Sequence, residues 1–336
     1  MTEPEGGDCP GDAPGACPPA IDYLRMSITD RCNLRCVYCM PAEGVDSLRH
    51  DDIMSYEELE LFARAAHLAG ITRIRLTGGE PLVRKGVVDF IRMLAAIDPG
   101  LGLSLTTNGV ELARFAEELK SAGLRRVNVS LDSLEPAVYR RITRVGTLEL
   151  ALDGVRCAIE VGLDPVKINV VTLKGINDDP APFAALTSEL PVHVRFIEYM
   201  PYFGEGGGRW FVPGDAIRER VEALGVLEEV SASPEGWGPA NYFRLRGAPG
   251  TIGFISPVSC HFCPTCNRVR ISAEGRMRTC LFDGDGVDVR SEMRVGADKE
   301  RLREIILSEL ARKHAEGHRK PQGGARIGDH MSRIGG

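Results

Sequence analysis

The chain has 336 residues and a formal net charge of −6, and its share of apolar residues is that of a globular protein. The negative charge argues against a broad nucleic-acid footprint, and no run of about eighteen apolar residues is present to predict a membrane span. Its 10 cysteines lie in a chain without an export signal, which favours a reducing, cytoplasmic location over a framework of disulfides.

The first segment, residues 1–20, is rich in Pro, Gly, Asp and Glu and has neither the basic nor the apolar region of a signal peptide. A segment of this composition cannot bury enough apolar surface to fold by itself. It is therefore predicted to be a disordered tail.

From Tyr23 to about Met200, short apolar runs alternate with amphipathic stretches, a pattern typical of repeated βα units. The expected strands are residues 24–29, 73–77, 102–107, 126–131, 165–172 and 192–198. A helix is expected over Ser55–Ala69, where Ser55 and Glu58 have the spacing of a capping box. The pattern predicts an α/β fold with a partial (β/α)6 TIM-like barrel over residues 21–200. The change in composition after residue 200 argues against a complete eight-unit barrel.

The first expected strand leads into a loop with three cysteines at C-x3-C-x2-C spacing, Cys32, Cys36 and Cys39. A structural zinc site needs four ligands, whereas a [4Fe-4S] cluster held by three cysteines keeps one iron free for a ligand that is not protein. A zinc knuckle with a distant fourth ligand and three buried cysteines are the alternatives, although the loop is too polar for core. Tyr38 could pack against the flat face of a bound ligand.

Polar or glycine-rich motifs follow four further expected strands. They are TGGEP at 77–81, TTNG at 106–109, SLDS at 130–133 and EYMP at 198–201. Each of them alone is compatible with a simple βα turn. In barrels of parallel strands the chemistry gathers at the C-terminal ends of the strands, so together they predict a site at that edge.

Residues 201–336 are predicted to form a C-terminal region with a helix over 213–224, a hairpin, a helix over 298–314 and a basic, glycine-rich tail. A second cysteine group, Cys263, Cys266 and Cys280, also offers three thiolates, and a zinc site closed by Cys260 or His261 stays open as an alternative. Arg268 and Arg270 alternate after Cys266, so in a strand both would point to one side, towards a ligand.

Lys167 interrupts an otherwise apolar expected strand. An unpaired lysine in a barrel wall would be costly, so Lys167 is a candidate for binding an anion. The alternative is a solvated lysine on the outer side.

The first cysteine loop, with Tyr38 before its last cysteine, resembles the radical S-adenosylmethionine (SAM) superfamily. With TGGEP, TTNG, the CNRVR run at 266–270, CLF at 280–282 and the terminal Gly335-Gly336, residues 22–336 resemble the GTP 3′,8-cyclase family of molybdenum cofactor biosynthesis. The resemblance implies a lyase that cyclises GTP to (8S)-3′,8-cyclo-7,8-dihydroguanosine 5′-triphosphate. The reactive radical would come from SAM, so no catalytic residue is implied beyond the cluster and SAM.

The resemblance also implies the site residues. Two [4Fe-4S] clusters would be bound, the first by Cys32, Cys36 and Cys39 and the second by Cys263, Cys266 and Cys280. SAM would contact Tyr38, Gly79, Ser130 and Met200. GTP would contact Arg25, Arg75, Thr106, Lys167, Arg195, Arg268, Val269 and Arg270, and the tail residues Gly335 and Gly336 would reach the GTP site.

The partners implied are an electron donor such as flavodoxin or ferredoxin, a downstream cyclic pyranopterin monophosphate synthase, and a second copy of the chain if a homodimer forms. Neither nucleic acid nor a membrane is expected as a partner. Two other functions stay open: a radical SAM enzyme with an auxiliary cluster that acts on a peptide or RNA, and a non-catalytic module with two zinc sites.

Overall fold

The computed structural model describes residues 19–200, 207–230, 238–260, 262–281 and 286–316. The predicted tail, apart from its last two residues, lies outside them, as do His261, Gly335 and Gly336. No helix in the described ranges is long and apolar enough to cross a bilayer.

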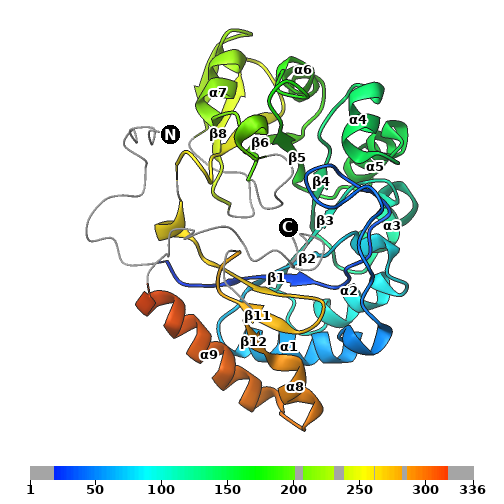
Figure 1. Ribbon diagram of the computed structural model, residues 1–336, viewed down its shortest axis with the longest axis vertical. Helices are drawn as coiled ribbons and strands as arrows, with labels where there is room; N and C mark the ends of the chain where they lie inside the picture. Colours follow the sequence, from blue (N-terminus) through cyan, green and yellow to red (C-terminus); the bar gives the residue numbers. More distant parts are fainter. Residues whose placement is uncertain (1–18, 201–206, 231–237, 261, 282–285, 317–336) are drawn as a thin grey trace.

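Twelve strands of the described residues form one sheet in the order β12-β11-β10-β1-β2-β3-β4-β5-β6-β9-β8-β7 (Figure 1). The strands are β1 (Tyr23–Ser27), β2 (Arg73–Thr77), β3 (Gly102–Thr107), β4 (Arg126–Ser130), β5 (Val166–Thr172), β6 (His193–Glu198), β7 (Leu227–Glu229), β8 (Asn241–Leu245), β9 (Thr251–Ile255), β10 (Arg268–Ile271), β11 (Arg276–Arg278) and β12 (Val287–Asp288). The helices are α1 (Tyr56–Leu68), α2 (Val87–Ala95), α3 (Leu112–Ser121), α4 (Pro136–Thr143), α5 (Leu148–Glu160), α6 (Ala181–Glu189), α7 (Gly214–Glu222), α8 (Val289–Arg294) and α9 (Lys299–Glu316), with short 3-10 helices η1 (His50–Asp52), η2 (Pro81–Val83), η3 (Gly207–Trp210) and η4 (Cys263–Thr265).

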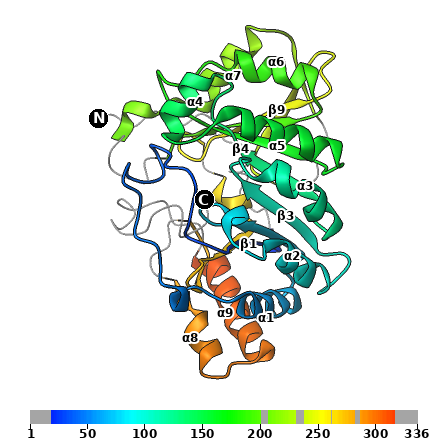
Figure 2. The ribbon, with the colours of Figure 1, turned by 90° about the vertical axis from the view of Figure 1, so that its right-hand side faces the viewer.

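The six predicted strands correspond to β1–β6, which are parallel and adjacent in chain order. Their predicted bounds agree with the structure to within two residues. Helices α1–α6 lie between these strands in the chain and cover the outside of the curved sheet (Figures 1 and 2). The predicted α/β fold with a partial barrel of six βα units is confirmed.

The region after residue 200 extends the parallel sheet at both edges, which the sequence did not indicate. Strand β10 pairs in parallel with β1, and β9 pairs in parallel with β6. Eight parallel strands therefore lie side by side, but only six come from the predicted βα units. Since β9 and β10 stand at opposite ends of this run, the barrel is open. The division of the chain at residue 200 stays a prediction.

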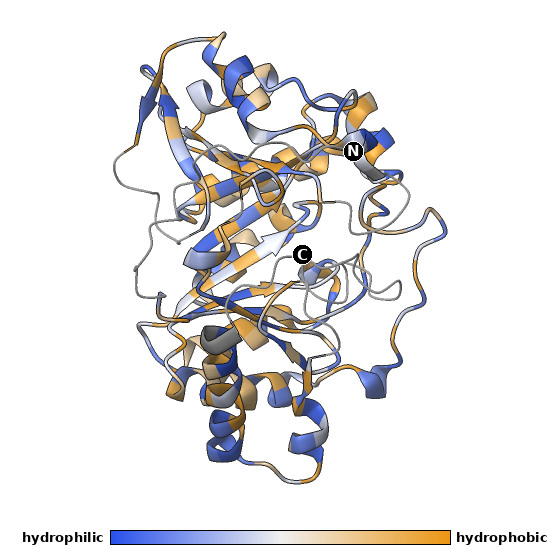
Figure 3. Ribbon diagram, turned by 60° about the vertical axis from the view of Figure 1, so that its left-hand side comes forward, coloured by the Kyte–Doolittle hydropathy of each residue, from blue (hydrophilic) through white to orange (hydrophobic). Residues whose placement is uncertain are grey.

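Side chains alternate between the two faces of these strands, as a pleated strand requires. On β1, Leu24 and Met26 are fully buried and share the hydrophobic core with helix residues such as Phe62. Their neighbour Arg25 points to the opposite face, away from the helices. Figure 3 shows hydrophilic and hydrophobic residues alternating along the central strands. The interior face of the sheet, as we call the side turned away from the helices, is thus polar, whereas the apolar face holds the core.

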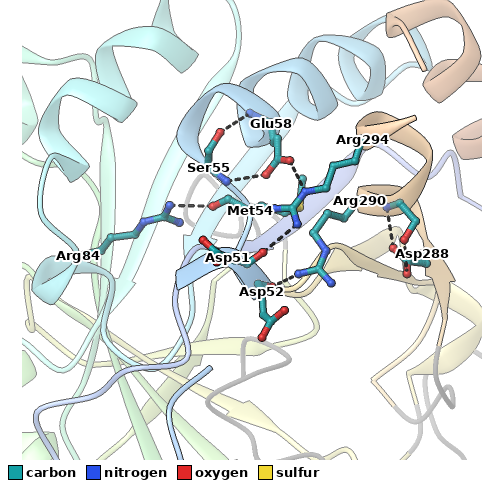
Figure 4. A network of polar contacts seen from close by, with 10 residues as sticks. Asp51, Asp52, Met54, Ser55, Glu58, Arg84, Asp288, Arg290 and Arg294 are labelled. Atoms are coloured by element: carbon teal, nitrogen blue, oxygen red, sulfur yellow. Dashed lines mark hydrogen bonds and ion pairs between the residues drawn. The ribbon is translucent and has the colours of Figure 1, made fainter. Parts of the chain in front are cut away.

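The start of α1 joins the N-terminal and C-terminal parts of the chain. Ser55 and Glu58 form the predicted capping box, in which the Glu58 N–H donates to Ser55 Oγ at 3.1 Å and the Ser55 N–H donates to Glu58 Oε2 at 2.8 Å. Arg294 of α8 donates to Glu58 Oε1 at 2.9 Å, and Arg290 donates to the Asp52 carbonyl (Figure 4). Helix α9 packs along α1. The C-terminal helices therefore attach to the first βα unit.

Candidate functional site

The loop that carries Cys32, Cys36 and Cys39 follows β1 and is fixed by backbone bonds. The Val37 N–H donates to the Ile142 carbonyl at 2.9 Å, at the end of α4. Arg144 has a positive φ of 65° and turns its guanidinium back onto the loop, where Nη1 donates to the Met40 carbonyl at 2.8 Å. The loop is therefore held from α4, an element about a hundred residues away in the chain.

The TGGEP motif lies against the same loop. The Gly79 N–H donates to the Thr29 carbonyl at 2.8 Å. A Cβ atom at Gly78 would lie 2.4 Å from the Thr29 oxygen, and one at Gly79 would lie 2.3 Å from the Arg31 oxygen. Only glycine allows the two backbones to approach so closely.

Glu80 connects this turn to the TTNG motif. Its buried carboxylate accepts from Thr107 Oγ1 at 2.8 Å and from the Asn108 N–H at 2.6 Å. Burial raises the pKa of Glu80 to about 7. The Asn108 amide donates in turn to Asn33 Oδ1, inside the cysteine loop, at 2.7 Å. The turns after β2 and β3 thus hold the cysteine loop through hydrogen bonds.

The SLDS motif supplies a contact that the sequence analysis missed. The Tyr38 hydroxyl donates to Asp132 Oδ2 at 2.6 Å, and the other Asp132 oxygen accepts from the Val171 N–H at 2.8 Å. Burial raises the pKa of Asp132 to about 6. Tyr38 is therefore fixed by its hydroxyl at the ends of β4 and β5. The sequence signal that could have predicted this contact is the position of Asp132, an acidic residue directly after a strand of a βα unit.

The three thiols of this loop are close enough to affect one another. Burial and the charges of Asp132, Cys39 and Cys32 raise the pKa of Cys36 well above its usual value. In the described ranges, no group of three or more His, Cys, Asp or Glu is arranged to hold a metal ion. Thiolates on one zinc would be only ~3.8 Å apart, whereas a cluster spreads them over separate irons. The donor set fits a cluster with three cysteine ligands.

The second cysteine group is brought together by a hairpin. Cys263 begins η4, Cys266 precedes β10, and β11 pairs antiparallel with β10, so the chain returns to Cys280 beside them. Although burial opposes it, the charges of Arg268 and Lys313 lower the pKa of Cys266 to about 6. Cys260 is disulfide-bonded, whereas Cys263, Cys266 and Cys280 are free thiols. Three thiols in a positive environment suit a metal centre.

Most of the side chains predicted to bind GTP lie on the interior face of the sheet. The strand register places Arg270, Arg25 and Arg75 side by side in one row. Burial and the neighbouring Arg270 hold the pKa of Arg25 well below its usual value. A guanidinium nevertheless stays charged, so this row is a region of strongly positive potential.

Arg195 and Lys167 face the same interior from β6 and β5. Arg195 is 3% exposed and donates to Asn128 Oδ1 at 2.9 Å and to Asn169 Oδ1. Lys167 is also 3% exposed, so the alternative of a solvated outer lysine is wrong. Its Nζ lies 5.9 Å from the centre of the Tyr242 ring.

These cations affect one another across the interior. Burial and the charge of Arg195 lower the pKa of Lys167 to about 6, and Arg75 and Arg126 act in the same direction. Arg75 contacts Ser104 Oγ at 3.4 Å and the Tyr23 ring at 5.2 Å. Among the described residues, neither Arg75 nor Arg195 forms an ion pair with a carboxylate. The arrangement is suited to a polyanionic ligand.

The other predicted site residues lie as follows. Gly79 follows β2, Ser130 ends β4 and Met200 follows β6, so all three lie at the C-terminal edge of the parallel strands. Ser130 shares a register row with Asn169 and Arg195, and Thr106 pairs with Asn128, which pairs with Lys167. Val269 differs from the rest, because its side chain is buried in the hydrophobic core and only its backbone could meet a ligand.

Several polar residues of the interior were missed by the sequence analysis. They are Tyr23, Ser104, Asn128, Asn169 and His193. Each stands at an alternate position of a strand, so the period-2 pattern within each strand was the available signal.

Comparisons with known proteins show the family of this chain. The profile of the Radical SAM superfamily matches residues 26–186, and that of Molybdenum Cofactor Synthesis C matches residues 192–319. A GTP 3′,8-cyclase of Thermodesulfovibrio yellowstonii is 47% identical over 329 residues, which cover 94% of this chain and 98% of that one. A GTP 3′,8-cyclase of Geobacter sulfurreducens is 52% identical over 272 residues, which cover 80% of this chain and 83% of that one.

Among solved structures, Streptococcus suis SuiB bound to S-adenosylmethionine has a TM-score of 0.60 at 15% identity, covering 86% of this chain and 68% of that one. This likeness concerns the fold alone. The relatives, in contrast, are 47% and 52% identical over 94% and 80% of this chain, which confirms the resemblance drawn from the motifs. Membership implies SAM and a [4Fe-4S] cluster as cofactors. The chain belongs to the GTP 3′,8-cyclase family of radical SAM enzymes.

Proposed function

We propose that this chain cyclises GTP to (8S)-3′,8-cyclo-7,8-dihydroguanosine 5′-triphosphate, the first step of molybdenum cofactor biosynthesis. The observation that carries the proposal is the interior row of Arg270, Arg25 and Arg75, faced by Arg195 and Lys167. A nucleoside triphosphate carries several negative charges, and guanidinium groups bind phosphate oxygens through two parallel hydrogen bonds. The names of the relatives agree with this substrate.

In this proposal GTP is bound by Arg25, Arg75, Thr106, Lys167, Arg195, Arg268, the Val269 backbone and Arg270. SAM is bound by Tyr38, Gly79, Ser130 and Met200, and the first cluster by Cys32, Cys36 and Cys39. When bound, SAM and this cluster supply the radical that takes hydrogen from the substrate.

The work left to the protein is orientation and exclusion of water. Ser130 and Arg195 share a register row, so the SAM and GTP contacts adjoin on one face. Asp132 holds Tyr38, and Glu80 holds the turn of Gly79, which keeps the SAM contacts in place. Because a carbon radical reacts with any nearby C–H group, this fixed geometry directs it to the ribose of GTP.

The second [4Fe-4S] cluster is part of the same proposal, with Cys263, Cys266 and Cys280 as ligands. Its support is the hairpin that gathers these three thiols and the positive surroundings of Cys266. A zinc site closed by Cys260 is disfavoured, because Cys260 is disulfide-bonded and a disulfide sulfur is not a thiolate ligand. The tail residues Gly335 and Gly336 are proposed to reach the GTP site.

The reaction needs an electron from outside, so the proposal includes a donor such as flavodoxin or ferredoxin. It also includes a cytoplasmic location, a homodimer, and a cyclic pyranopterin monophosphate synthase that consumes the product. The proposals of these partners and of this location are based on membership of the family.

The test is an anaerobic incubation of the reconstituted protein with SAM, a reductant and GTP, followed by mass spectrometry of the nucleotide. Cyclised GTP is expected, and ATP in place of GTP should give none. Arg195→Leu should weaken GTP binding about 30-fold, or ~2 kcal/mol, because a buried phosphate loses a charged partner. The exposed Arg125→Leu serves as the matched control and should bind GTP normally. SAM cleavage that leaves GTP unchanged would refute the proposed reaction.

A further inference from the structure

Helix α9 carries a buried lysine that the proposed reaction does not use. Lys313 is 6% exposed, and lysine is almost never buried to this extent unless its charge is paired. Its Nζ donates to Cys266 Sγ at 3.5 Å, to the Thr279 carbonyl at 3.1 Å and to the Arg268 carbonyl. These three acceptors match the three N–H donors of an ammonium group.

The three acceptors belong to β10 and to the segments just before β10 and just after β11. Arg268 begins β10 just after Cys266, and Thr279 follows β11 just before Cys280. Lys313 therefore bridges the segments that carry two of the three thiols. Since α9 packs along α1, the bridge also attaches the hairpin to the barrel (Figure 1).

The acceptors of Lys313 are two backbone carbonyls and one sulfur. In the part of the chain that the structure describes, no carboxylate accepts from Lys313, because Glu309 of the same helix pairs with Arg312. A buried ammonium that meets only carbonyls would be costly, whereas a thiolate supplies the opposite charge. The geometry thus places a buried ammonium donor against the sulfur of Cys266.

We propose that Lys313 is a positioning residue for the second cluster. It holds the Cys266 sulfur through a charged hydrogen bond, and it bridges β10 to the segment before Cys280. The inference rests on the proposed second cluster. Outer groups that donate to a metal ligand fix its orientation, and hydrogen bonds to cluster sulfurs raise the reduction potential. The contact to the Arg268 carbonyl also sets the start of the strand that presents Arg268 and Arg270 to GTP.

The experiment compares Lys313→Met with Lys299→Met, an exposed lysine at the other end of α9. Both are reconstituted anaerobically as full chains, and iron per chain, electron paramagnetic resonance and the midpoint potential of each cluster are measured. Lys313→Met should either lose the second cluster or keep it at a more negative potential, because the reduced cluster loses a positive neighbour. Its first cluster should cleave SAM at the wild-type rate. Lys299→Met should match the wild type throughout.

Lys313→Arg keeps the charge and should restore iron content and move the potential back towards the wild type. If Lys313→Met fails to fold, Lys313→Gln, which keeps a donor without the charge, should still show the lowered potential. Unchanged iron content and unchanged potentials in these variants would overturn the inference. A wild-type protein that binds only about four irons per chain would instead overturn the second cluster itself, whatever Lys313 does.

Discussion

At the scale of single residues, the interior of the barrel concentrates positive charge where burial makes that charge costly. Burial lowers the pKa of Arg75 to about 10 and of Lys167 to about 6, which means that charge on either group is unfavourable there. An arginine cannot release its proton under ordinary conditions, but a lysine can. Lys167 is therefore the group that should change its protonation when an anion binds.

We predict that GTP binding at pH 8 takes up about one proton per chain, because phosphate raises the pKa of Lys167 above the pH of the solution. Without ligand the folded protein holds Lys167 neutral above about pH 6, whereas the unfolded chain keeps it charged up to its ordinary pKa of 10.5. Stability without ligand should thus rise as the pH rises through this window. Calorimetry in buffers of different ionisation enthalpy measures the uptake.

The control for this prediction is Lys167→Met, which should bind GTP more weakly and without proton uptake. Other charged groups that act on Lys167 are the arginines named above and Asp164. His193, whose pKa burial lowers to about 4, also lies beside Lys167. If proton uptake persists unchanged in Lys167→Met, the proton belongs to another group such as His193.

At the scale of elements, the ends of neighbouring strands form one support for the cysteine loop. Gly79 and Glu80 bond to its backbone, Asn108 bonds to Asn33 within it, and Asp132 holds Tyr38. Hydrogen bonds of this kind contribute about 1 kcal/mol each and leave costly unsatisfied groups when one partner is lost. The loop is therefore pre-organised for its ligands by three different βα turns.

We predict that Gly79→Ala displaces the cysteine loop and lowers iron by about four per chain, because its Cβ would lie 2.3 Å from the Arg31 oxygen. The atoms that this Cβ would meet belong to the backbone of Arg31, which cannot move aside as a flexible side chain can. Gly208→Ala is the matched control, since no atom lies within 4 Å of its Cβ and neither glycine needs a positive φ. Iron analysis and SAM binding measure the effect. Normal iron content in Gly79→Ala would show that the loop tolerates the shift.

At the scale of the whole molecule, the C-terminal region both widens the sheet and brings the second cysteine group to the barrel. Strand β10 pairs with β1, so Arg268 and Arg270 stand next to Tyr23 and Arg25. At the opposite edge, Glu198 at the end of β6 accepts from the backbone N–H groups of Val258 and Ser259 at 2.9 Å and fixes the segment that leads to η4. The two cysteine groups belong to separate segments: the loop of Cys32 follows β1, whereas Cys266 precedes β10, which runs parallel to β1.

We predict that each cysteine group can be disabled without the loss of the other. Cys36→Ala should abolish SAM cleavage, because a cluster with two of its three cysteine ligands is not retained. Cys280→Ala should keep measurable SAM cleavage but give no cyclised GTP, since the SAM contacts do not include the hairpin. Chromatography of 5′-deoxyadenosine and of the nucleotide product measures both activities. Equal loss of SAM cleavage in both variants would argue against separate roles.

The sequence by itself determined the parts of this protein that depend on local pattern. Strands β1–β6 and helix α1 could be predicted because the spacing of apolar residues and the capping residues are set by neighbours in the sequence. Cys32, Cys36 and Cys39 were recognisable as candidate ligands because all three lie in one short loop. The family followed from motifs spread along the chain, since each motif is itself local.

Only the tertiary structure decided which distant segments meet. Nothing local to β9 or β10 indicates that these strands join β6 and β1, because strand pairing depends on burial of the whole sheet. For the same reason the bond from Tyr38 to Asp132 and the bridge from Lys313 to Cys266 could not be read from spacing. The row of Arg270, Arg25 and Arg75 likewise arises from the register between strands, which brings together charges that lie up to about 245 residues apart in the chain.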